Sequence, residues 1–527
     1  MERYDLVIIG AGPAGLSAAI EAARCGMNIA VYDENKRPGG QLFKQIHKFF
    51  GSKEHHAKER GFHIGEELLA EADRLGVDVS LDTVVTGLYP GNEVMIKKGG
   101  QVSHVRGDTV LLAAGASENM APFDGWTLPG VIGAGAAQTM MNLHGIRPGS
   151  RVLMLGSGNV GLVVSYQLLQ AGCEVAAVVD AAPKIGGYGV HAAKLARCGV
   201  PFQLSSTIVR AKGGDHVEGA VIGRMDEHGK IIPGSETEID CDTICIAVGL
   251  SPMNQLARMS GCRMEQNPKK GGCVPVCNEY GETSVRGLFA AGDAEGIEEA
   301  SSAMIEGRIA GIACANRLGF LEDGKAKEAV ESNEQALDTL RQGMFAPKNR
   351  GKQIEKTDEG FPVSQHLLVT GFLGDDEVEV YPGVTHPKGL HPVIECTQNI
   401  PCNPCQDACP HGCIHIGSFI TALPAVEASA ECIGCGRCVA SCSGQAIFLV
   451  NEDIGGGYAS VTMPYEFMPL PEKGDIGLAC SRDGQAIGEA EVLDVKSVKA
   501  FDHTNLLTIR VPAELSGKAR FYKAAQQ

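Results

Sequence analysis

The sequence predicts an α/β protein with four parts: two β–α–β units, the second inserted into the domain that the first begins, then a small cysteine-rich domain and a small β domain. Three observations lead to this prediction. Glycine-rich turns at Gly10 and Gly156 each join a short apolar strand to an apolar helix. Nine of the 19 cysteines lie between Cys396 and Cys442. From Gly457 onward, short apolar segments alternate with polar turns, as is typical of small β domains.

Length and charge limit the possible partners. The chain has 527 residues, enough for roughly three or four domains. Its 46 Lys and Arg against 63 Asp and Glu give a net charge of −17, which argues against nucleic acid or an anionic membrane as the main partner. There is no apolar run of about 18 residues, and the opening segment MERYDLVIIG has no signal-peptide pattern. We therefore expect a cytoplasmic protein without a membrane span, whose thiols are reduced or bind metal.

The first glycine-rich turn predicts a Rossmann-like dinucleotide-binding domain. Gly10 permits the tight turn, Gly12 lets the backbone approach a pyrophosphate, and Gly15 allows the helix to pack closely on the strand. The N-terminus of the helix then faces the phosphates. Asp33 ends the next strand, where a carboxylate accepts the ribose hydroxyls, and Glu34 is the fallback for that role. The turn residues expected at the nucleotide are Gly10, Gly12, Pro13, Ala14 and Gly15.

A second copy of this pattern begins at Arg151 and predicts an NAD-binding domain. Asp180 follows its second strand, and an acid there favours NAD because it repels the 2′-phosphate of NADP. The next residues, Ala181–Pro183, offer no arginine for that phosphate. The alternatives that this domain binds another nucleotide, or none, stay open. The residues expected at NAD are Gly156, Gly158, Asn159, Val160, Gly161 and Asp180.

Three further segments indicate that the first nucleotide is FAD. Pro38–Gln41 (PGGQ) follows the acid, Ala114–Gly115 ends a strand, and GLFAAGDAEG contains Gly292 and Asp293. With these segments, residues 1–320 resemble the flavoproteins that carry two dinucleotide-binding domains. The resemblance implies that the GGQ turn lines the flavin, that Asp293 binds its ribityl chain and that Ala114–Gly115 lies near the adenosine half. The FAD residues that it adds are Gly40, Gln41, Ala114, Gly115, Gly292 and Asp293.

Within these flavoproteins, the chain resembles the alpha-type subunits of amine and amino-acid dehydrogenases. The segments VYDENKRPGGQL, FDGWTLPGVIGAGAAQTMM and TSVRGLFAAGDAEGIEEASSAMIEGRIAG carry this resemblance. Such subunits occur in sarcosine oxidase, hydrogen cyanide synthase and proline or hydroxyproline dehydrogenase. A disulfide reductase is not expected, because no cysteine pair follows Gly39–Gly40 and no CxxC lies in residues 120–250.

The cysteine spacing predicts two 4Fe–4S clusters. Cys432, Cys435, Cys438 and Cys442 have the C-x2-C-x2-C-x3-C spacing of bacterial ferredoxins, in which the fourth cysteine binds the other cluster. A structural zinc site would use only four cysteines. In the upstream motif, aligning CPHGCI on CSGQAI makes Cys409 the equivalent of Cys442.

One position of the upstream motif departs from the ferredoxin pattern. Asn399 stands where a cysteine is expected, so Cys396 must supply that ligand across a longer loop. Cys413 is the alternative to Cys396. The first cluster is expected on Cys396, Cys402, Cys405 and Cys442, and the second on Cys432, Cys435, Cys438 and Cys409.

The same patterns predict where the domains begin and end. The segment ETEIDCDTICIAVG mirrors the earlier TVLLAAGA and closes the inserted domain near Gly249. A helix over 325–342 and a linker over 346–360 are expected before the cysteines. The predicted parts are an FAD-binding domain (1–118 and 251–320), an inserted NAD(P)-type domain (119–250), a helix and linker (321–384), a ferredoxin-like domain with two 4Fe–4S clusters (385–455) and a small β domain (456–527).

The resemblance and the motifs together predict an FAD- and iron–sulfur-dependent oxidoreductase. The expected role is that of the electron-transferring subunit of a heteromeric dehydrogenase for an amine or amino acid such as proline, hydroxyproline or sarcosine. A separate catalytic flavoprotein subunit would oxidise the substrate, and NAD or a ferredoxin would exchange electrons with this chain. Two alternatives are a self-contained NADH:ferredoxin-type oxidoreductase and a non-catalytic electron-relay scaffold. No catalytic side chain can be named, because the cofactors supply the reactivity.

Overall fold

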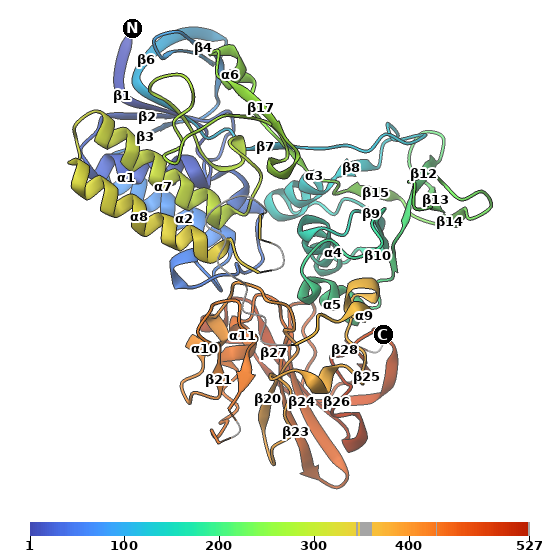
Figure 1. The fold of residues 1–527 in the computed structure, drawn as a ribbon. Helices are drawn as coiled ribbons and strands as arrows, with labels where there is room; N and C mark the ends of the chain where they lie inside the picture. Colours follow the sequence, from blue (N-terminus) through green and yellow to red (C-terminus); the bar gives the residue numbers. More distant parts are fainter. Residues whose placement is uncertain (344–345, 348–360, 428, 525–527) are drawn as a thin grey trace.

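The computed structural model describes residues 1–343, 346–347, 361–427 and 429–524. Figure 1 shows two nucleotide-binding units side by side, with the C-terminal region (orange to red) against both of them. Within the described residues, no helix is long and apolar enough to cross a membrane.

The first unit is a seven-stranded sheet in the order β3-β2-β1-β6-β5-β4, with β19 also paired to β6. Strand β1 runs parallel to β2 and β6, as the β–α–β pattern predicts. Its elements are β1 (Glu2–Ile9), α1 (Pro13–Arg24), β2 (Ile29–Tyr32), α2 (Gly61–Arg74), β3 (Asp78–Ser80), β4 (Thr83–Tyr89), β5 (Glu93–Lys98), β6 (Gln101–Leu112), α6 (Gln255–Met259), β17 (Met264–Asn267), β18 (Gly272–Pro275), β19 (Leu288–Ala290) and α7 (Ala300–Arg317).

Helices α1 and α7 pack unusually close on one face of this sheet because α7 carries glycines at the contact. A Cβ on Gly307 would lie 2.1 Å from the carbonyl oxygen of Ala14, and one on Gly311 would lie 2.5 Å from that of Ala18. The two helices cover buried side chains of the sheet, which include Leu6, Ile8 and Leu111.

The second unit is a five-stranded parallel sheet in the order β11-β10-β9-β15-β8, with a separate antiparallel sheet β12-β13-β14. The chain enters it after β7 and leaves it before β16, and these two strands pair with each other. The elements are β7 (Ala116–Glu118), β8 (Val131–Gly133), α3 (Ala134–Gln138), β9 (Arg151–Leu155), α4 (Asn159–Gln170), β10 (Glu174–Val179), α5 (Gly189–Arg197), β11 (Phe202–Gln203), β12 (Ser206–Lys212), β13 (Gly219–Arg224), β14 (Thr237–Ile239), β15 (Thr243–Ile246) and β16 (Leu250–Pro252).

Two helices connect the nucleotide units to the C-terminal region. Helix α8 (Asp323–Leu340) has the predicted length, but its first and last residues each lie two positions earlier than in the predicted range of 325–342. It packs against α7. Most of the predicted linker at 346–360 lies outside the described residues. Helix α9 (Gln365–Thr370), which the sequence did not predict, begins after Ser364, whose hydroxyl accepts the N–H of Leu367 at 2.9 Å.

The C-terminal region is built on one antiparallel sheet in the order β20-β23-β24-β27-β26-β25-β28. Strands from both sides of the predicted boundary at 455/456 belong to this sheet, because β23 and β24 form a hairpin across it through Gly455–Gly457. The elements are β20 (His391–Ile394), α10 (Pro404–Ala408), β21 (Ile414–His415), β22 (Ala425–Val426), α11 (Arg437–Ser441), β23 (Ile447–Gly455), β24 (Tyr458–Tyr465), β25 (Ile476–Cys480), β26 (Ala486–Lys496), β27 (Asn505–Pro512) and β28 (Phe521–Ala524).

Candidate functional site

The first glycine-rich turn leaves open space at the N-terminus of α1. Gly10 has a φ of 105°, in the region that favours glycine, and a Cβ on Gly15 would lie 1.9 Å from the Gly10 carbonyl oxygen. A Cβ on Gly12, in contrast, meets no described atom within 4 Å. Gly10 and Gly15 therefore form the turn, while Gly12 faces the space that a pyrophosphate would fill.

The Asp33 carboxylate is engaged with the turn itself. Its Oδ2 accepts the N–H of Ala11 at 2.7 Å, and its Oδ1 accepts the N–H of Asn35 at 2.8 Å. Asp33 is buried, whereas Glu34 is exposed beside it. The predicted ribose acceptor thus holds the turn in shape, and the predicted fallback is the carboxylate that faces outward.

The other residues predicted to contact FAD converge on the same edge of the sheet. Gly39 donates its N–H to the carbonyl of Ala11 at 2.7 Å, and a Cβ on Gly40 would lie 2.9 Å from the Cα of Gly12. A Cβ on Gly292 would lie 3.0 Å from the Cβ of Ala14. This edge carries the carboxyl ends of parallel strands, where α/β sheets bind their ligands.

Two of these segments are held by specific bonds. The Gly292 N–H donates to the Glu306 carboxylate at 2.9 Å, and Asp293 Oδ1 accepts the N–H of Glu298 at 3.2 Å. At the end of β6, Gly115 has a φ of 74° and accepts the N–H of Met253 at 3.0 Å. Gln41 is exposed.

The second glycine-rich turn repeats the first in detail. Gly156 has a φ of 112°, a Cβ on Gly161 would lie 2.1 Å from the Gly156 carbonyl oxygen, and a Cβ on Gly158 meets no described atom within 4 Å. Asp180 Oδ2 accepts both the N–H and the hydroxyl of Ser157 at 2.6 Å. Val160 is exposed. The predicted NAD residues thus form the same kind of open cradle.

Sequence reasoning missed a second glycine pair at this turn. Gly186 donates its N–H to the hydroxyl of Ser157 at 3.0 Å, and Gly187 donates to the Ser157 carbonyl at 2.8 Å. Gly186–Gly187 begins six residues after Asp180, just as Gly39–Gly40 begins six residues after Asp33. That repeated spacing is the signal that could have found it.

Four of the cysteines form a group between the nucleotide units and the C-terminal sheet. We call Cys396, Cys402, Cys405 and Cys442 the inner set. Burial raises the pKa of the Cys396 thiol, and Cys442 and Cys405 raise it further. The pKa of Cys402 is also raised, mainly by burial and further by Cys405, Cys442 and Cys396. Cys405 is buried and the other three cysteines are half-buried. Four such thiols at one place favour a bound cation, because a thiolate away from water is costly without one.

The inner set touches both nucleotide units. Phe50, Tyr188 and Val190 pack around its cysteines, and the rings of Phe50 and Tyr188 lie 5.2 Å apart. The Gly51 carbonyl, in the segment after the predicted flavin turn, accepts the N–H of Asn403 at 3.1 Å. The carbonyl of Phe49 accepts the hydroxyl of Ser443 at 2.6 Å. These bonds attach the cysteines to the loop that leads away from Gly39–Gly40.

The other five cysteines lie farther out, and we call Cys409, Cys413, Cys432, Cys435 and Cys438 the outer set. Burial raises the pKa of Cys438, with added effects of Cys432, Cys409 and Cys435. All five line one cavity of about 20 Å³. Ile433 at its rim is 59% exposed. The outer set therefore lies close to solvent.

Cys413 lies with the outer set rather than beside Cys402 and Cys405. Its N–H donates to the Cys409 sulfur at 3.3 Å, and in the same way the N–H of Ala446 donates to the Cys442 sulfur at 3.4 Å. Cys413 thus occupies the position of Ala446, as the alignment of the two motifs predicts.

Comparison with known proteins identifies the nucleotide-binding part. Residues 4–307 match the pyridine nucleotide-disulphide oxidoreductase family. The chain belongs to this family. It is an FAD-dependent oxidoreductase with an NAD(P)-type Rossmann domain, which confirms the predicted enzyme class. The family match ends before the first residue of the inner set.

Two curated proteins are similar to this chain in sequence, and one solved structure is similar to it in fold. It is 30% identical over 382 residues to an opine oxidase subunit of Agrobacterium tumefaciens, covering 65% of this chain and 74% of that one. The HcnB subunit of hydrogen cyanide synthase from Pseudomonas aeruginosa is 27% identical, over 73% of this chain and 87% of its own. The fold resembles that of T. acidophilum thioredoxin reductase, with a TM-score of 0.50, 19% identity, and coverage of 60% and 99%.

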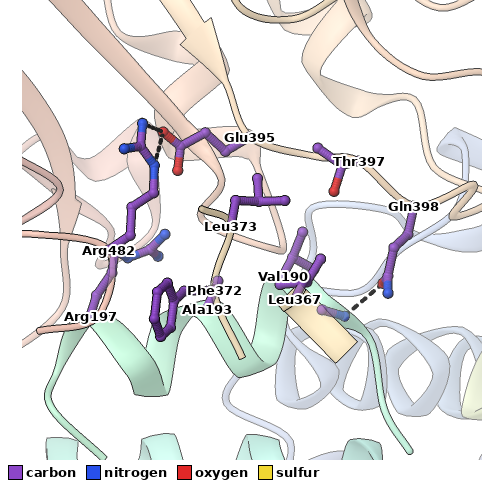
Figure 2. Close-up of a pocket in the computed structure, with 11 residues that line it drawn as sticks. Val190, Ala193, Arg197, Leu367, Phe372, Leu373, Glu395, Thr397, Gln398 and Arg482 are labelled. Atoms are coloured by element: carbon purple, nitrogen blue, oxygen red, sulfur yellow. Dashed lines mark hydrogen bonds and ion pairs between the residues drawn. The ribbon is translucent and has the colours of Figure 1, made fainter. Parts of the chain in front are cut away.

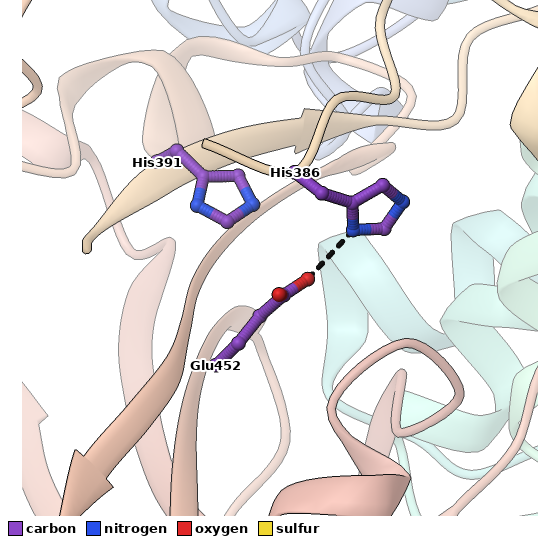
Figure 3. Close-up of side chains that lie close together, drawn as sticks. All are labelled: His386, His391 and Glu452. Carbon is purple, nitrogen blue, oxygen red and sulfur yellow. Dashed lines mark hydrogen bonds and ion pairs between the residues drawn. The ribbon is translucent and has the colours of Figure 1, made fainter. Parts of the chain in front are cut away.

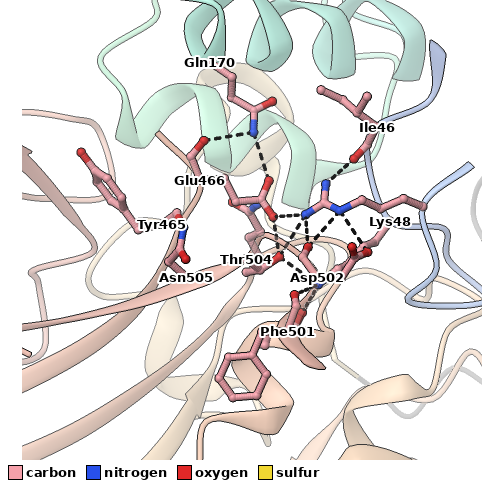
Figure 4. A network of polar contacts seen from close by, with 12 residues as sticks. Ile46, Lys48, Gln170, Tyr465, Glu466, Phe501, Asp502, Thr504 and Asn505 are labelled. Atoms are coloured by element: carbon pink, nitrogen blue, oxygen red, sulfur yellow. Dashed lines mark hydrogen bonds and ion pairs between the residues drawn. The ribbon is translucent and has the colours of Figure 1, made fainter. Parts of the chain in front are cut away.

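A polar junction joins both units of the oxidoreductase to the C-terminal sheet (Figure 4). Lys48 donates to the carbonyls of Ala440 at 2.6 Å and Phe501 at 2.9 Å. The Glu466 carboxylate accepts a hydrogen bond from the Arg60 guanidinium of the first unit and one from the Gln170 amide of the second, both at 3.0 Å. Burial would raise the pKa of Glu466, but Arg60, Thr504 and Lys48 lower it overall, so its carboxylate stays ionised.

A second contact joins α5 to the segment around Cys396 (Figure 2). Gly189 donates its N–H to Gln398 at 2.6 Å, and Arg482 pairs with Glu395 at 2.7 Å. Burial opposes ionisation of Glu395, but Arg520 and Arg482 lower its pKa to about 2. The cavity beside them holds about 10 Å³, room for no more than a water molecule. This contact is structural.

Proposed function

We propose that the chain is the electron-transferring subunit of a heteromeric amine or amino-acid dehydrogenase, with FAD, NAD(H) and two 4Fe–4S clusters. The observation that carries the proposal is the place of the inner set, which packs against Phe50 and Tyr188. The residues that follow Cys402 and Cys442 are hydrogen-bonded to the loop after the flavin turn. An electron carrier held there would stand between the flavin edge and the molecular surface.

The two glycine-rich turns supply the nucleotide sites. Gly12 and Gly40 would lie against the FAD pyrophosphate, Glu34 would accept the ribose hydroxyls and Asp33 would hold the turn. Gly158 and Asp180 would serve NAD in the second unit. When bound, the flavin takes up a two-electron hydride and releases single electrons, which 4Fe–4S clusters can carry.

The cysteine geometry supports a specific ligand assignment. The inner set of Cys396, Cys402, Cys405 and Cys442 would hold one cluster, and Cys409, Cys432, Cys435 and Cys438 the other. Cys413 would donate its N–H to the Cys409 sulfur rather than bind iron, as Ala446 does for Cys442. Such N–H bonds to sulfur are among the factors that set cluster potentials.

The expected partner is inferred from the relatives. The opine oxidase and hydrogen cyanide synthase relatives are both named as subunits. We infer that a second, flavin-containing subunit oxidises proline, hydroxyproline, sarcosine or a similar amine. The outer set, close to solvent, would pass electrons to or from an external acceptor such as a ferredoxin, and the second nucleotide unit would exchange them with NAD.

Iron content and electron paramagnetic resonance test the ligand assignment. The chain reconstituted without oxygen should hold about eight iron atoms. Cys396→Ala should lose the inner cluster, while Cys413→Ala should keep both. Unchanged iron in Cys396→Ala, or equal loss in the two variants, would contradict the assignment.

Activity measurements test the role. Amine-dependent dye reduction should appear only after co-expression with a partner subunit, and NADH should bleach the flavin of the isolated chain without oxygen. Amine oxidation by the isolated chain would contradict the subunit role. NADH-driven ferredoxin reduction without any partner subunit would favour a self-contained NADH:ferredoxin oxidoreductase, and a flavin that NADH cannot bleach would favour a relay scaffold.

A further inference from the structure

Two histidines and a glutamate lie together at the start of the C-terminal sheet (Figure 3). His386 precedes β20, His391 is its first residue, and Glu452 lies in the paired strand β23. One ligand atom of each side chain lies within 4.8 Å of the other two.

His391 is buried with one nitrogen unused. The residue is 2% exposed, and its Nδ1 lies 2.9 Å from the Gly389 carbonyl oxygen, to which it donates. Its Nε2 has no hydrogen-bond partner among the described residues. A buried polar atom left without a partner costs about 1–3 kcal/mol. An imidazole whose Nδ1–H is tied to a carbonyl presents Nε2 as a lone pair, which is the usual state of a metal-binding histidine.

His386 is oriented by two carboxylates. Its Nδ1 lies 2.6 Å from Glu452 and its Nε2 lies 2.8 Å from Glu379. The two nitrogens of one imidazole thus lie between two carboxylates. A divalent cation would place positive charge beside these carboxylates and also use the free nitrogen of His391.

We propose that His386, His391 and Glu452 form a zinc site. The ligand atoms are Nδ1 of His386, Nε2 of His391 and a carboxylate oxygen of Glu452, a combination of imidazole and carboxylate that suits Zn²⁺. Glu379 and the Gly389 carbonyl hold the second nitrogen of each histidine, as outer partners do in zinc sites. On binding, the Nδ1 proton of His386 passes to solvent while Nε2–H keeps its bond to Glu379, and the hydrogen bond between His386 and Glu452 is replaced by two metal bonds.

The fourth position of this site faces solvent, because the side chains of His386 and Glu452 are 44% and 42% exposed. A bound ion would connect the segment before β20 to the far end of β23. The site uses none of the cysteines and no nucleotide residue, so it is independent of the proposed electron-transfer role.

A comparable surface pair serves as the matched control. His104 and Glu93 lie 2.6 Å apart with similar exposure but without a second imidazole. His56, Glu59 and Glu67 also form a group, but it contains only one imidazole and its residues are half-buried or exposed. Neither combines a buried free nitrogen with a carboxylate.

Zinc content and X-ray absorption test the proposal on the full-length chain after its thiols have been loaded with iron and sulfide. We expect one zinc per chain, with only nitrogen and oxygen ligands at about 2.0–2.1 Å. Glu452→Gln and His391→Gln should weaken zinc binding by more than the about 10–100-fold that loss of an outer partner costs. His104→Gln should bind zinc as the unchanged chain does.

Two results would overturn the site. A sulfur shell at about 2.3 Å would place the zinc on cysteines, and unchanged affinity in Glu452→Gln would remove the proposed ligand. Glu452 is exposed, so this variant remains a valid test where His391→Gln fails to fold. Loss of iron with retained zinc would count against the proposed function alone.

Discussion

The two glycine-rich turns of this oxidoreductase agree where they shape the backbone and differ where they face solvent. In both, a buried or half-buried aspartate accepts the N–H of the residue after the first glycine, at 2.7 Å for Asp33 and 2.6 Å for Asp180. The aspartate is followed by Glu34 in the first unit and by Ala181 in the second.

The comparison separates two roles that sequence motifs combine. The paired aspartates and the glycines with positive φ make the turn, and so they recur whatever nucleotide binds. We expect discrimination between nucleotides to depend on the outward positions, such as Glu34 and Ala181. The units also differ in how they contact the C-terminal region. The first unit contacts it through a charged loop with Lys48 and Arg60, and the second contacts it through the ends of α4 and α5.

Placing valine at the open glycine of each turn should have the largest effect. Because a Cβ at Gly12 or Gly158 meets no described atom within 4 Å, the fold should tolerate Gly12→Val and Gly158→Val, while the side chain blocks the pyrophosphate. We expect Gly12→Val to be isolated without flavin, and Gly158→Val to keep flavin but lose its reduction by NADH. Absorbance at the flavin bands measures the bound flavin, and anaerobic titration measures its reduction by NADH. A Gly12→Val protein that is still yellow would show that the open glycine of the first turn does not face the FAD pyrophosphate.

The second-largest effect should come from removing the charge of Glu466, whose carboxylate binds both nucleotide units. Glu466→Gln removes a buried carboxylate that pairs with Arg60 and leaves Asp502 as the other acid paired with Arg60, at a cost of about 2–3 kcal/mol in the free energy of unfolding. Gln170→Met, which removes the neutral contact of the second unit, should cost about 1 kcal/mol. Denaturant unfolding at pH 7 measures both, and equal effects would mean that charge does not distinguish the two attachments.

The pH dependence of this difference has a defined sign. The pKa of Glu466 is lowered in the folded protein from an ordinary value of 4.5. The stability that its charge contributes is therefore complete above about pH 4.5 and is lost as the pH falls through the lower folded pKa. The gap between the unchanged chain and Glu466→Gln should shrink below pH 4.5, and a gap that grows on acidification would contradict the assignment.

Alanine at the crowded glycines should have a smaller effect on stability. In Gly15→Ala and Gly161→Ala the new Cβ would meet a carbonyl oxygen at 1.9 or 2.1 Å, so each should lose about 1–3 kcal/mol in the free energy of unfolding. Gly12→Ala, with open space, is the control. Thermal unfolding checks the result, and a Gly12→Ala variant as unstable as Gly15→Ala would contradict this view of the turn.

The smallest expected effect is on FAD affinity and comes from the outward-facing carboxylate of Glu34. Glu34→Gln should weaken FAD binding by about 3–10-fold, as loss of about 0.5–1.5 kcal/mol predicts, without changing thermal stability. Fluorescence titration of the flavin-free chain measures it. A drop in stability without any change in affinity would show that Glu34, like Asp33, supports the fold instead of the ligand.

Much of the nucleotide-binding part could be predicted from sequence because its signals are local. Strand, turn, helix and acid follow one another within about 25 residues, and glycine is required wherever φ is positive or another backbone comes too close. The cysteine spacing is local in the same sense. Helix α9 and the pair Gly186–Gly187 were missed although local signals for them were present, a capping serine and a repeated spacing.

Other features depend on contacts between distant segments. Sequence left Cys396 and Cys413 as alternatives, and their different neighbours, Cys442 and Cys405 for Cys396 and Cys409 for Cys413, arise only after folding. The meeting of Arg60 with Glu466, and of His391 with Glu452, likewise joins residues far apart in the chain.

The sequence by itself therefore determined the two nucleotide turns and the cysteine motifs, because steric limits on the backbone and the reach of neighbouring ligands act over a few residues. Only the tertiary structure decided which cysteines face the flavin unit, which carboxylate turns outward and which histidine is left with a free nitrogen. Those outcomes depend on burial and on the pairing of distant strands, and neither is encoded in any single segment.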